Sequence, residues 1–156
     1  MSPEGAAPRR VMAVGPPGAG KTTLLAALGL VEGRVRKTEM VTFSPLSIDT
    51  PGELLDNPRL YHAILMNATK ARVVLFLADG TRDSRYPPGL ARSIRVPVLG
   101  VVTKSDEATA EGVRRAREVL LRAGAREVRR CSSVTGEGLR EMKERIEELL
   151  EEGCSR

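Results

Sequence analysis

The sequence predicts an α/β fold of three αβα layers, with a mostly parallel sheet of about six strands and one antiparallel edge strand. Short apolar segments alternate with helical patterns along most of the chain. The segment 73–78 (VVLFLA) is wholly apolar, which is typical of a parallel strand covered on both faces. A length of 156 residues without internal repeats fits one domain with a sizeable core.

Six short segments are the expected strands, separated by turn residues or polar stretches. They are Val11–Val14, Glu39–Phe43, Leu46–Ile48, Val73–Ala78, Val96–Val102 and Glu127–Cys131. Apolar residues at helical spacing predict helices between them, over Lys21–Leu30, Arg59–Lys70, Leu90–Ile94, from Val113 to Ala123 before Gly124, and Glu137–Glu152. We expect residues 1–8 to form a flexible tail, 9–152 a single domain and 153–156 a short C-terminal tail.

Composition excludes several protein classes. No run of about 18 apolar residues occurs and no signal-peptide pattern begins the chain, so membrane-spanning and secreted classes are not expected. The two cysteines cannot form a disulfide framework, which favours a reducing, cytoplasmic compartment. With two Tyr, two Phe and no Trp, the chain lacks the aromatic residues of a single-stranded nucleic-acid surface, so nucleic acid is not an expected partner.

The net charge of +5 suits an anionic ligand or partner without naming one. Much of the excess comes from arginines in two stretches, Arg114, Arg115, Arg117 and Arg122, then Arg126, Arg129 and Arg130. The interpretation we favour is a solvated helix face and strand edge. The alternative is a docking patch for an acidic partner or RNA.

The first strand leads into a full GxxxxGK[ST] motif, directly followed by a helix. The glycines let successive backbone N–H groups point at phosphates, the lysine adds charge at the β/γ oxygens, and the threonine hydroxyl can ligate Mg²⁺. The helix N-terminus adds its dipole. The expected nucleotide-binding residues here are Gly15, Pro16, Pro17, Gly18, Ala19, Gly20, Lys21, Thr22 and Thr23. Pro17 removes one potential donor from this loop.

Three later segments decide which nucleotide is bound. DTPG at 49–52 follows a strand, so that Asp49 can hold Mg²⁺ through water and the Gly52 N–H can reach the γ-phosphate. Thr103, Lys104 and Asp106 match [NT]KxD after a buried strand. A carboxylate there accepts two hydrogen bonds from guanine, whereas adenine would leave it unpaired at a cost of about 1–3 kcal/mol.

The third segment, Cys131-Ser132-Ser133, follows the last strand, where a backbone N–H, that of Ser133 foremost, could meet guanine O6. The order and spacing of all four segments resemble a small GTPase, a Ras-like G domain of the P-loop NTPases. GTP or GDP with Mg²⁺ is therefore the expected ligand.

Thr38 is the candidate for the switch threonine that coordinates Mg²⁺ only when the γ-phosphate is present, with Thr42 as the competitor. The expected metal ligands are thus Thr22, Thr38 and Asp49, and the expected catalytic contacts are Lys21, Thr38 and Gly52. Residues 31–43 and 50–60 are the segments expected to reshape for a protein partner.

Glu53 follows DxxG, where some switches carry a water-orienting Gln. Its charge opposes an anionic transition state, so unaided hydrolysis should be slow, about 10⁻⁴ to 10⁻² s⁻¹. No arginine stands out as a catalytic finger, and Arg34, Arg36 and Arg59 are the candidates for that role. Gly18 stands where potassium-activated relatives carry Asn, so no strong potassium dependence is expected.

Across residues 9–150 the chain resembles the EutP/PduV family of P-loop GTPase-like proteins. The likeness lies in GPPGAGKTTLL, RKTEMVTF, SIDTPGELLDNPRLYHAIL, YPPGLARSIRVPVLGVVTKSD and SSVTGEGL. The resemblance implies a bacterial cytoplasmic protein of ethanolamine or propanediol utilisation. A microcompartment shell or a metabolic enzyme would then be its partner.

Three functions remain open from the sequence. The first is a GTPase switch. The second is a P-loop kinase that phosphorylates a small acid such as acetate with ATP or GTP, for which Arg82 and Arg85 could bind the acceptor. The third is a non-catalytic nucleotide-binding module that acts through its surface.

Overall fold

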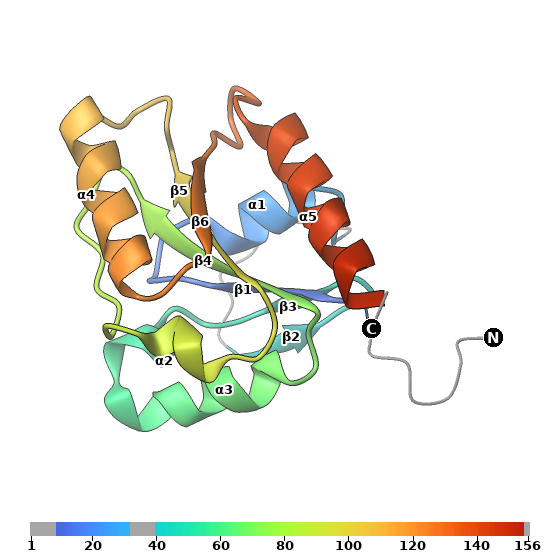
Figure 1. Cartoon of the computed structure of the whole chain (residues 1–156). Helices are drawn as coiled ribbons and strands as arrows, with labels where there is room; N and C mark the ends of the chain where they lie inside the picture. Colours follow the sequence, from blue (N-terminus) through green and yellow to red (C-terminus); the bar gives the residue numbers. More distant parts are fainter. Residues whose placement is uncertain (1–8, 32–39, 155–156) are drawn as a thin grey trace.

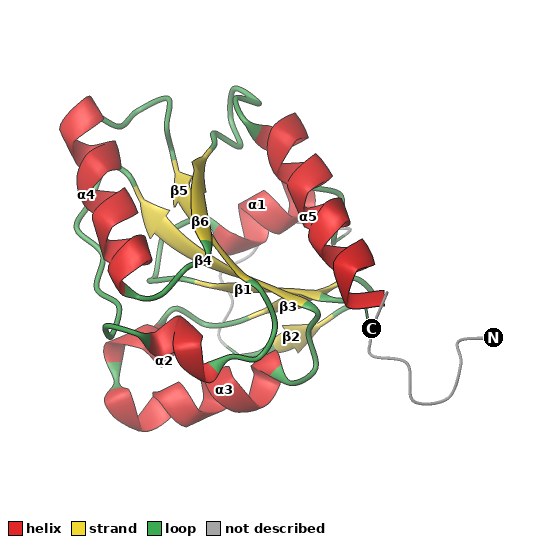
Figure 2. Cartoon of the chain, viewed as in Figure 1, coloured by secondary structure: helices red, strands yellow, loops and turns green. Residues whose placement is uncertain are grey.

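The computed structural model describes residues 9–31 and 40–154. The predicted fold class is confirmed: six strands form one sheet in the order β2-β3-β1-β4-β5-β6, and only the β2–β3 pair is antiparallel. Figure 1 shows this twisted sheet with helices on both faces, and Figure 2 separates its helices, strands and loops. The strands are β1 (Val11–Val14), β2 (Thr42–Phe43), β3 (Ser47–Asp49), β4 (Val73–Asp79), β5 (Val98–Thr103) and β6 (Glu127–Arg130).

The helices divide between the two faces of the sheet (Figure 1). Helices α1 (Lys21–Ala27) and α5 (Leu139–Cys154) cover one face, and α2 (Glu53–Asp56), α3 (Tyr61–Ala68) and α4 (Ala110–Arg122) cover the other, with two 3₁₀ turns, Pro58–Leu60 and Leu90–Ser93. All seven residues of β4 are buried, because Val73, Leu75 and Leu77 pack toward one helical layer and Val74, Phe76 and Ala78 toward the other.

Several predicted bounds were wrong for identifiable reasons. The first helix ends at Ala27 rather than Leu30, because Gly29 adopts a φ of +75° that closes the helix. The predicted strand 39–43 is a strand only over Thr42–Phe43, within the part of the chain that is described. The helix expected over 59–70 begins as a 3₁₀ turn at Pro58 and becomes α-helical only at Tyr61. Helix α2 was not predicted, since four residues are too few to show a period.

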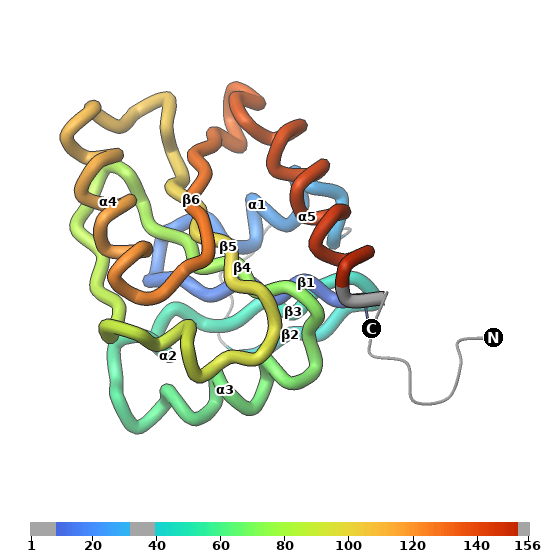
Figure 3. Tube along the Cα trace, in the orientation of Figure 1, coloured from blue at the N-terminus to red at the C-terminus, as the bar shows by residue number. Residues whose placement is uncertain are grey.

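Strand β1 is the switch point of the topology, because its neighbours in the sheet are β3 on one side and β4 on the other, and the chain forms β2 and β3 before it crosses to β4. In open α/β sheets ligands bind beyond the carboxyl ends of the strands at such a point. The trace in Figure 3 can be followed from the end of β1 directly into α1. The GxxxxGK[ST] segment occupies that turn.

The carboxyl end of β4 is held close to the start of α4 by two glycines. A β-carbon at Gly112 would lie 2.2 Å from the carbonyl oxygen of Gly80, and one at Gly80 would lie 2.8 Å from Cβ of Ala108. The Thr109 hydroxyl caps α4 by accepting the N–H of Gly112 at 3.0 Å. The backbone of α4 at Gly112 therefore contacts the backbone at Gly80, next to the ends of β4 and β5.

Replacing Gly112 should reverse the usual effect of adding a methyl group to a helix. Ala normally stabilises a helix by up to about 1 kcal/mol relative to Gly. We expect Gly112→Ala to lower the free energy of unfolding by about 1–3 kcal/mol, because the methyl group meets the Gly80 carbonyl. Urea unfolding measures this, with Arg117→Ala on the exposed side of α4 as the control. A more stable Gly112→Ala protein would contradict the packing described.

Candidate functional site

The GxxxxGK[ST] segment forms a tight loop between β1 and α1. Gly18 and Gly20 have φ values of +80° and +89°, which side chains disfavour, and Ala19 donates its N–H to the Pro16 carbonyl at 3.2 Å. Gly20 is the N-cap residue of α1 and Lys21 is its first residue. The chain thus turns directly into a helix N-terminus, the geometry in which backbone N–H groups bind phosphate.

The Lys21 ammonium group lies inside this loop. The side chain is buried, and Nζ donates to the carbonyl oxygens of Gly15 at 2.9 Å and Pro16 at 3.1 Å. Burial lowers the pKa of Lys21, and the negative charge of Asp49 is the largest of the charges that oppose this shift. The ammonium group of Lys21 thus has two neutral carbonyl oxygens as its hydrogen-bond partners, and an anionic phosphate would offer it a partner of opposite charge.

Thr22 and Asp49 meet between the ends of β1 and β3. The Thr22 hydroxyl donates a hydrogen bond to Oδ2 of Asp49, although the two residues are 27 positions apart. Asp49 is buried at the last position of β3. A hydroxyl and a carboxylate are the hard oxygen donors that Mg²⁺ prefers, so this pair fits the metal that the motif implies.

The DTPG turn is packed against the GxxxxGK[ST] segment, residues 15–22, which is called the phosphate loop below. Thr50 is fully buried, and its hydroxyl donates to the carbonyl oxygen of Ala13 in β1 at 2.8 Å. A β-carbon at Gly52 would lie 2.3 Å from the backbone nitrogen of Pro17. Only glycine fits at position 52 in this arrangement, and Pro17, which has no N–H, faces it without losing a hydrogen bond.

Lys104 connects the TKxD segment, to which it belongs, with the phosphate loop and with the end of β4. Its Nζ donates to the carbonyl oxygen of Gly18 at 2.9 Å and lies 2.9 Å from Oδ2 of Asp79. Its φ of +59° is the one positive value outside glycine among the described residues. Beside it, the Thr103 hydroxyl donates to the carbonyl oxygen of Ala19 at 2.8 Å. The TKxD segment is thereby bound to the phosphate loop at two points.

Asp106 and Ser132 form the remaining part of the site. The Ser132 hydroxyl lies 2.7 Å from Oδ1 of Asp106 and also accepts the N–H groups of Val134 and Thr135. The Ser132 N–H donates to the Glu137 carbonyl at 2.9 Å, whereas that of Ser133 has no acceptor in the described part of the chain. Of these two serines, Ser133 is thus the one whose N–H is unpaired among the described residues.

The structure therefore gathers four sequence-distant segments, 15–23, 49–52, 103–106 and 131–133, at one edge of the sheet. Thr38, Arg34 and Arg36 lie outside the described residues, and Thr42 is exposed in β2. Sequence reasoning missed Asp79 and Tyr86. Asp79 could have been noticed as an acid at the carboxyl end of a buried strand.

Two buried side chains support the site from β4 and its following loop. Burial alone would raise the pKa of Asp79, but hydrogen bonds from Thr81 and Lys104 outweigh it, and the net pKa lies below its ordinary value. The Tyr86 hydroxyl lies 3.1 Å from the carbonyl oxygen of Val14 and 2.6 Å from that of Leu77. Burial raises the pKa of Tyr86 well above its ordinary value, so this hydroxyl remains a donor.

The family model for ethanolamine utilisation and propanediol utilisation, PduV-EutP, matches residues 8–148. The chain belongs to the PduV-EutP family. It is 34% identical over 135 residues to the propanediol utilization protein PduV of Citrobacter freundii, covering 86% of this chain and 90% of the relative. It is 37% identical to the probable acetate kinase EutP of Salmonella typhimurium over 122 residues, and to that of Escherichia coli over 123 residues, with 76% of each chain covered.

Solved structures show the same fold for this PduV-EutP protein. A probable GTP-binding protein, engB, aligns with a TM-score of 0.65 at 20% identity over 92% of this chain and 99% of its own. The translation elongation factor SelB of Methanococcus maripaludis in complex with the GTP analogue GppNHp aligns with a TM-score of 0.63 at 20% identity, over 92% of this chain and 34% of SelB. The predicted G-domain architecture is thereby confirmed.

The arginine-rich surface of this family member is largely paired within the chain. Ion pairs join Arg114 to Glu111 and Glu118, Arg115 to Asp83, Arg126 to Glu152, Arg129 to Glu127 and Arg130 to Glu137. This arrangement favours the solvated-face interpretation over a basic docking patch. Within the described residues no helix is long and apolar enough to cross a bilayer.

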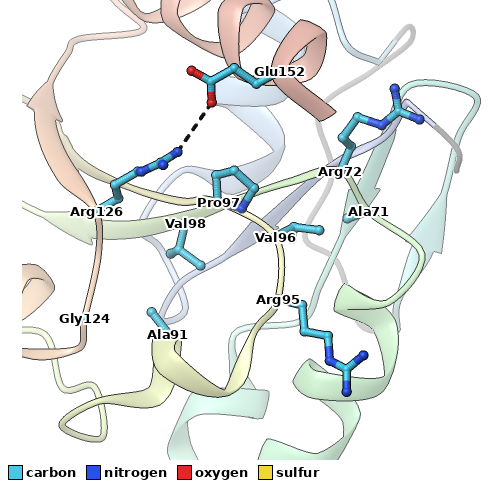
Figure 4. A pocket seen from close by; sticks show the side chains of 10 residues that line it. All are labelled: Ala71, Arg72, Ala91, Arg95, Val96, Pro97, Val98, Gly124, Arg126 and Glu152. Atoms are coloured by element: carbon cyan, nitrogen blue, oxygen red, sulfur yellow. Dashed lines mark ion pairs between the residues drawn. The ribbon is translucent and has the colours of Figure 1, made fainter. Parts of the chain in front are cut away.

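A hollow of about 440 Å³ lies near the amino ends of β4 and β5, away from the phosphate loop (Figure 4). Its floor is apolar, with Ala91, Val96 and Val98. The guanidinium groups around it do not converge, since Arg126 faces Glu152 at 3.5 Å while Arg72 and Arg95 point in different directions. This hollow has no arrangement that would bind an anion.

Asp79→Asn should destabilise the protein by about 1–3 kcal/mol at neutral pH, because Lys104 loses its charged partner. A carboxyl whose folded pKa is lowered adds stability above its unfolded pKa and loses it as the pH falls through the folded pKa. The gap between wild type and Asp79→Asn should therefore close in acid. Urea unfolding at stepwise lower pH measures it.

The matched control is Asp83→Asn, an exposed acid in the same loop that lies 3.7 Å from Arg115. It should change the free energy of unfolding by less than about 0.5 kcal/mol. A gap for Asp79→Asn that stays constant as the pH falls would contradict a charge-dependent role for this carboxyl.

Proposed function

We propose that this chain binds GTP and GDP with Mg²⁺ and hydrolyses GTP slowly. The observation that carries the proposal is the bridge made by Lys104, which joins a phosphate-binding loop at Gly18 to the segment that bears Asp106. A site for a whole nucleotide needs the phosphate-binding loop and the base-binding segment at a fixed separation, and the contacts of Lys104 would fix that separation. Localisation in the bacterial cytoplasm, within ethanolamine or propanediol utilisation, is part of the same proposal.

Phosphate binding is assigned to residues 15–23. Backbone N–H groups of the loop and the N-terminus of α1 would hold phosphate oxygens, and Lys21 would exchange its two carbonyl partners for them. Thr22 and Asp49 would hold Mg²⁺, Asp49 through water, with Thr38 as a third ligand from the switch segment. When bound, the metal neutralises charge that develops on the phosphates.

Guanine recognition is assigned to Asp106, with the N–H of Ser133 meeting O6 and the stem of Lys104 covering the base. The hydrogen bond with Ser132 fixes the Asp106 carboxylate at Oδ1. A fixed acceptor pair distinguishes guanine, which offers two donors, from adenine, which offers none there.

Hydrolysis is expected to be slow because Glu53, the residue directly after DxxG, would orient water only by adding negative charge. Glu53 is the first residue of α2 and is exposed. Its carboxylate stands where a neutral amide would serve better, so an unaided rate of about 10⁻⁴ to 10⁻² s⁻¹ is expected. Residues 31–43 and 50–60 would present the nucleotide state to a protein partner, such as a microcompartment shell protein or a metabolic enzyme.

Phosphoryl transfer to acetate is the second candidate, because two relatives at 37% identity carry the name probable acetate kinase EutP. In that reaction an acetate oxygen attacks the γ-phosphorus, the bond to the β–γ bridging oxygen breaks, and acetyl phosphate and GDP or ADP leave. Both candidates use the same nucleotide site and differ only in the acceptor.

Asp106→Asn should exchange guanine for xanthine preference. The amide keeps one acceptor oxygen, for N1–H, but replaces the other with an NH₂ donor, which pairs with the C2 carbonyl of xanthine and opposes the guanine 2-amino group. GDP affinity should fall by about 1–3 kcal/mol, roughly 5- to 150-fold, while xanthosine diphosphate affinity rises. Competition against fluorescent GDP measures both, and Glu107→Gln, an exposed neighbour, is the control. Equal competition by ATP in the wild type would overturn base reading by Asp106.

The acceptor is decided by assaying GTP and ATP with and without acetate. A GTPase releases inorganic phosphate at a rate that acetate leaves unchanged, and a kinase forms acyl phosphate, which hydroxylamine traps. We expect slow phosphate release from GTP and no hydroxamate. Acetate-dependent hydroxamate formation, abolished in Lys21→Met, would instead establish the kinase and exclude a simple switch.

A further inference from the structure

Arg82 lies beside the phosphate loop although it belongs to the loop 80–89 that follows β4. A β-carbon at Gly18 would be 3.4 Å from Nη1 of Arg82, which is van der Waals contact distance. The guanidinium therefore lies directly beside the phosphate loop at position 18.

The loop that carries Arg82 is fixed at both ends. Asp79 begins it with a turn, since Oδ1 accepts the N–H of Thr81 at 2.8 Å and its hydroxyl at 2.6 Å, and the Arg82 N–H donates to the Asp79 carbonyl at 3.2 Å. Tyr86 closes it, with its hydroxyl on the ends of β1 and β4 and its ring stacked 5.0 Å from that of Phe76. The backbone on both sides of Arg82 is therefore held by contacts with the sheet.

The Arg82 guanidinium is only weakly paired within the fold. Among residues 9–31 and 40–154 its one ion pair is with Asp79, at 4.0 Å, and the side chain is 68% exposed. Asp79 meanwhile already has Lys104 at 2.9 Å and the two donors of Thr81. A distant contact between a solvated arginine and a carboxylate that already has Lys104 and Thr81 as partners costs little to exchange.

We propose that Arg82 is a cation that this chain supplies to its own nucleotide, binding phosphate oxygens from the Gly18 side of the phosphate loop. The proposal rests on the proposed nucleotide binding and adds a residue that no motif of the sequence identifies. A guanidinium suits this position because it is always charged and its planar donors match phosphate oxygens. Arg82 would thus bind the phosphates of the nucleotide and not a carboxylate acceptor.

The test is the affinity for GDP and for a non-hydrolysable GTP analogue, measured by calorimetry with Arg82→Gln, Arg82→Lys and Arg122→Gln. Arg82→Gln should weaken GDP binding about tenfold, which is about 1.4 kcal/mol. Arg82→Lys should retain part of the affinity because it keeps the charge. Arg122→Gln, the same charge change at an exposed residue of α4, should stay within twofold of wild type.

Ionic strength provides a readout that is independent of catalysis. The affinity difference between wild type and Arg82→Gln should shrink as salt rises, because an exposed cation is screened. The melting temperature without nucleotide should be the same for both proteins, which separates lost binding from lost folding.

The outcomes distinguish the two proposals. If the wild type binds no guanine nucleotide, the proposed function fails. If it binds GDP and Arg82→Gln binds equally well, the proposed function stands and the role of Arg82 is wrong. A rise in acetate KM with unchanged GDP affinity would likewise overturn this role, and so would a larger loss in Arg85→Gln than in Arg82→Gln.

Discussion

The contact of one ammonium group with the Gly18 carbonyl and with Asp79 holds the site together. It requires that Asp79 and Lys104 emerge side by side, and the parallel register supplies this by pairing Asp79 with Thr103 at the ends of β4 and β5. The apolar residues 73–78 keep β4 buried on both faces as far as Asp79, so the first charged residue of this strand stands where it leaves the core. The packing of the core therefore also positions residues of the site.

Elements with their own local signal could be predicted from the sequence. The wholly apolar strands and the amphipathic α4 and α5 follow from burial on two faces or one. The misplaced bounds have a common origin, because each depends on a single backbone conformation or a very short element. Gly29 ends α1, Pro58 starts a 3₁₀ turn, and α2 buries Leu54 and Leu55 within four residues.

The same distinction applies to the site. Contiguous motifs carry their chemistry in neighbouring residues, so the loop 15–22 and the TKxD segment could be recognised. The contacts of Gly52 with Pro17, of Tyr86 with Val14 and of Arg82 near Gly18 each join residues that are far apart in sequence. No periodicity or spacing encodes such a pair, because each partner alone is an ordinary loop residue. Tertiary structure is needed to see them.

The choice between water and a carboxylate as phosphoryl acceptor is an electrostatic question at this site. Acetate must approach phosphates that are already anionic, so a kinase needs a cation beyond those that bind the nucleotide. Lys21 is directed into the phosphate loop and Lys104 is held by Asp79. If Arg82 also binds phosphate, Arg85 is the arginine of the loop 80–89 that is left for the acceptor, whereas water needs no cation. The assignment of Arg82 therefore bears directly on hydrolysis as the proposed reaction.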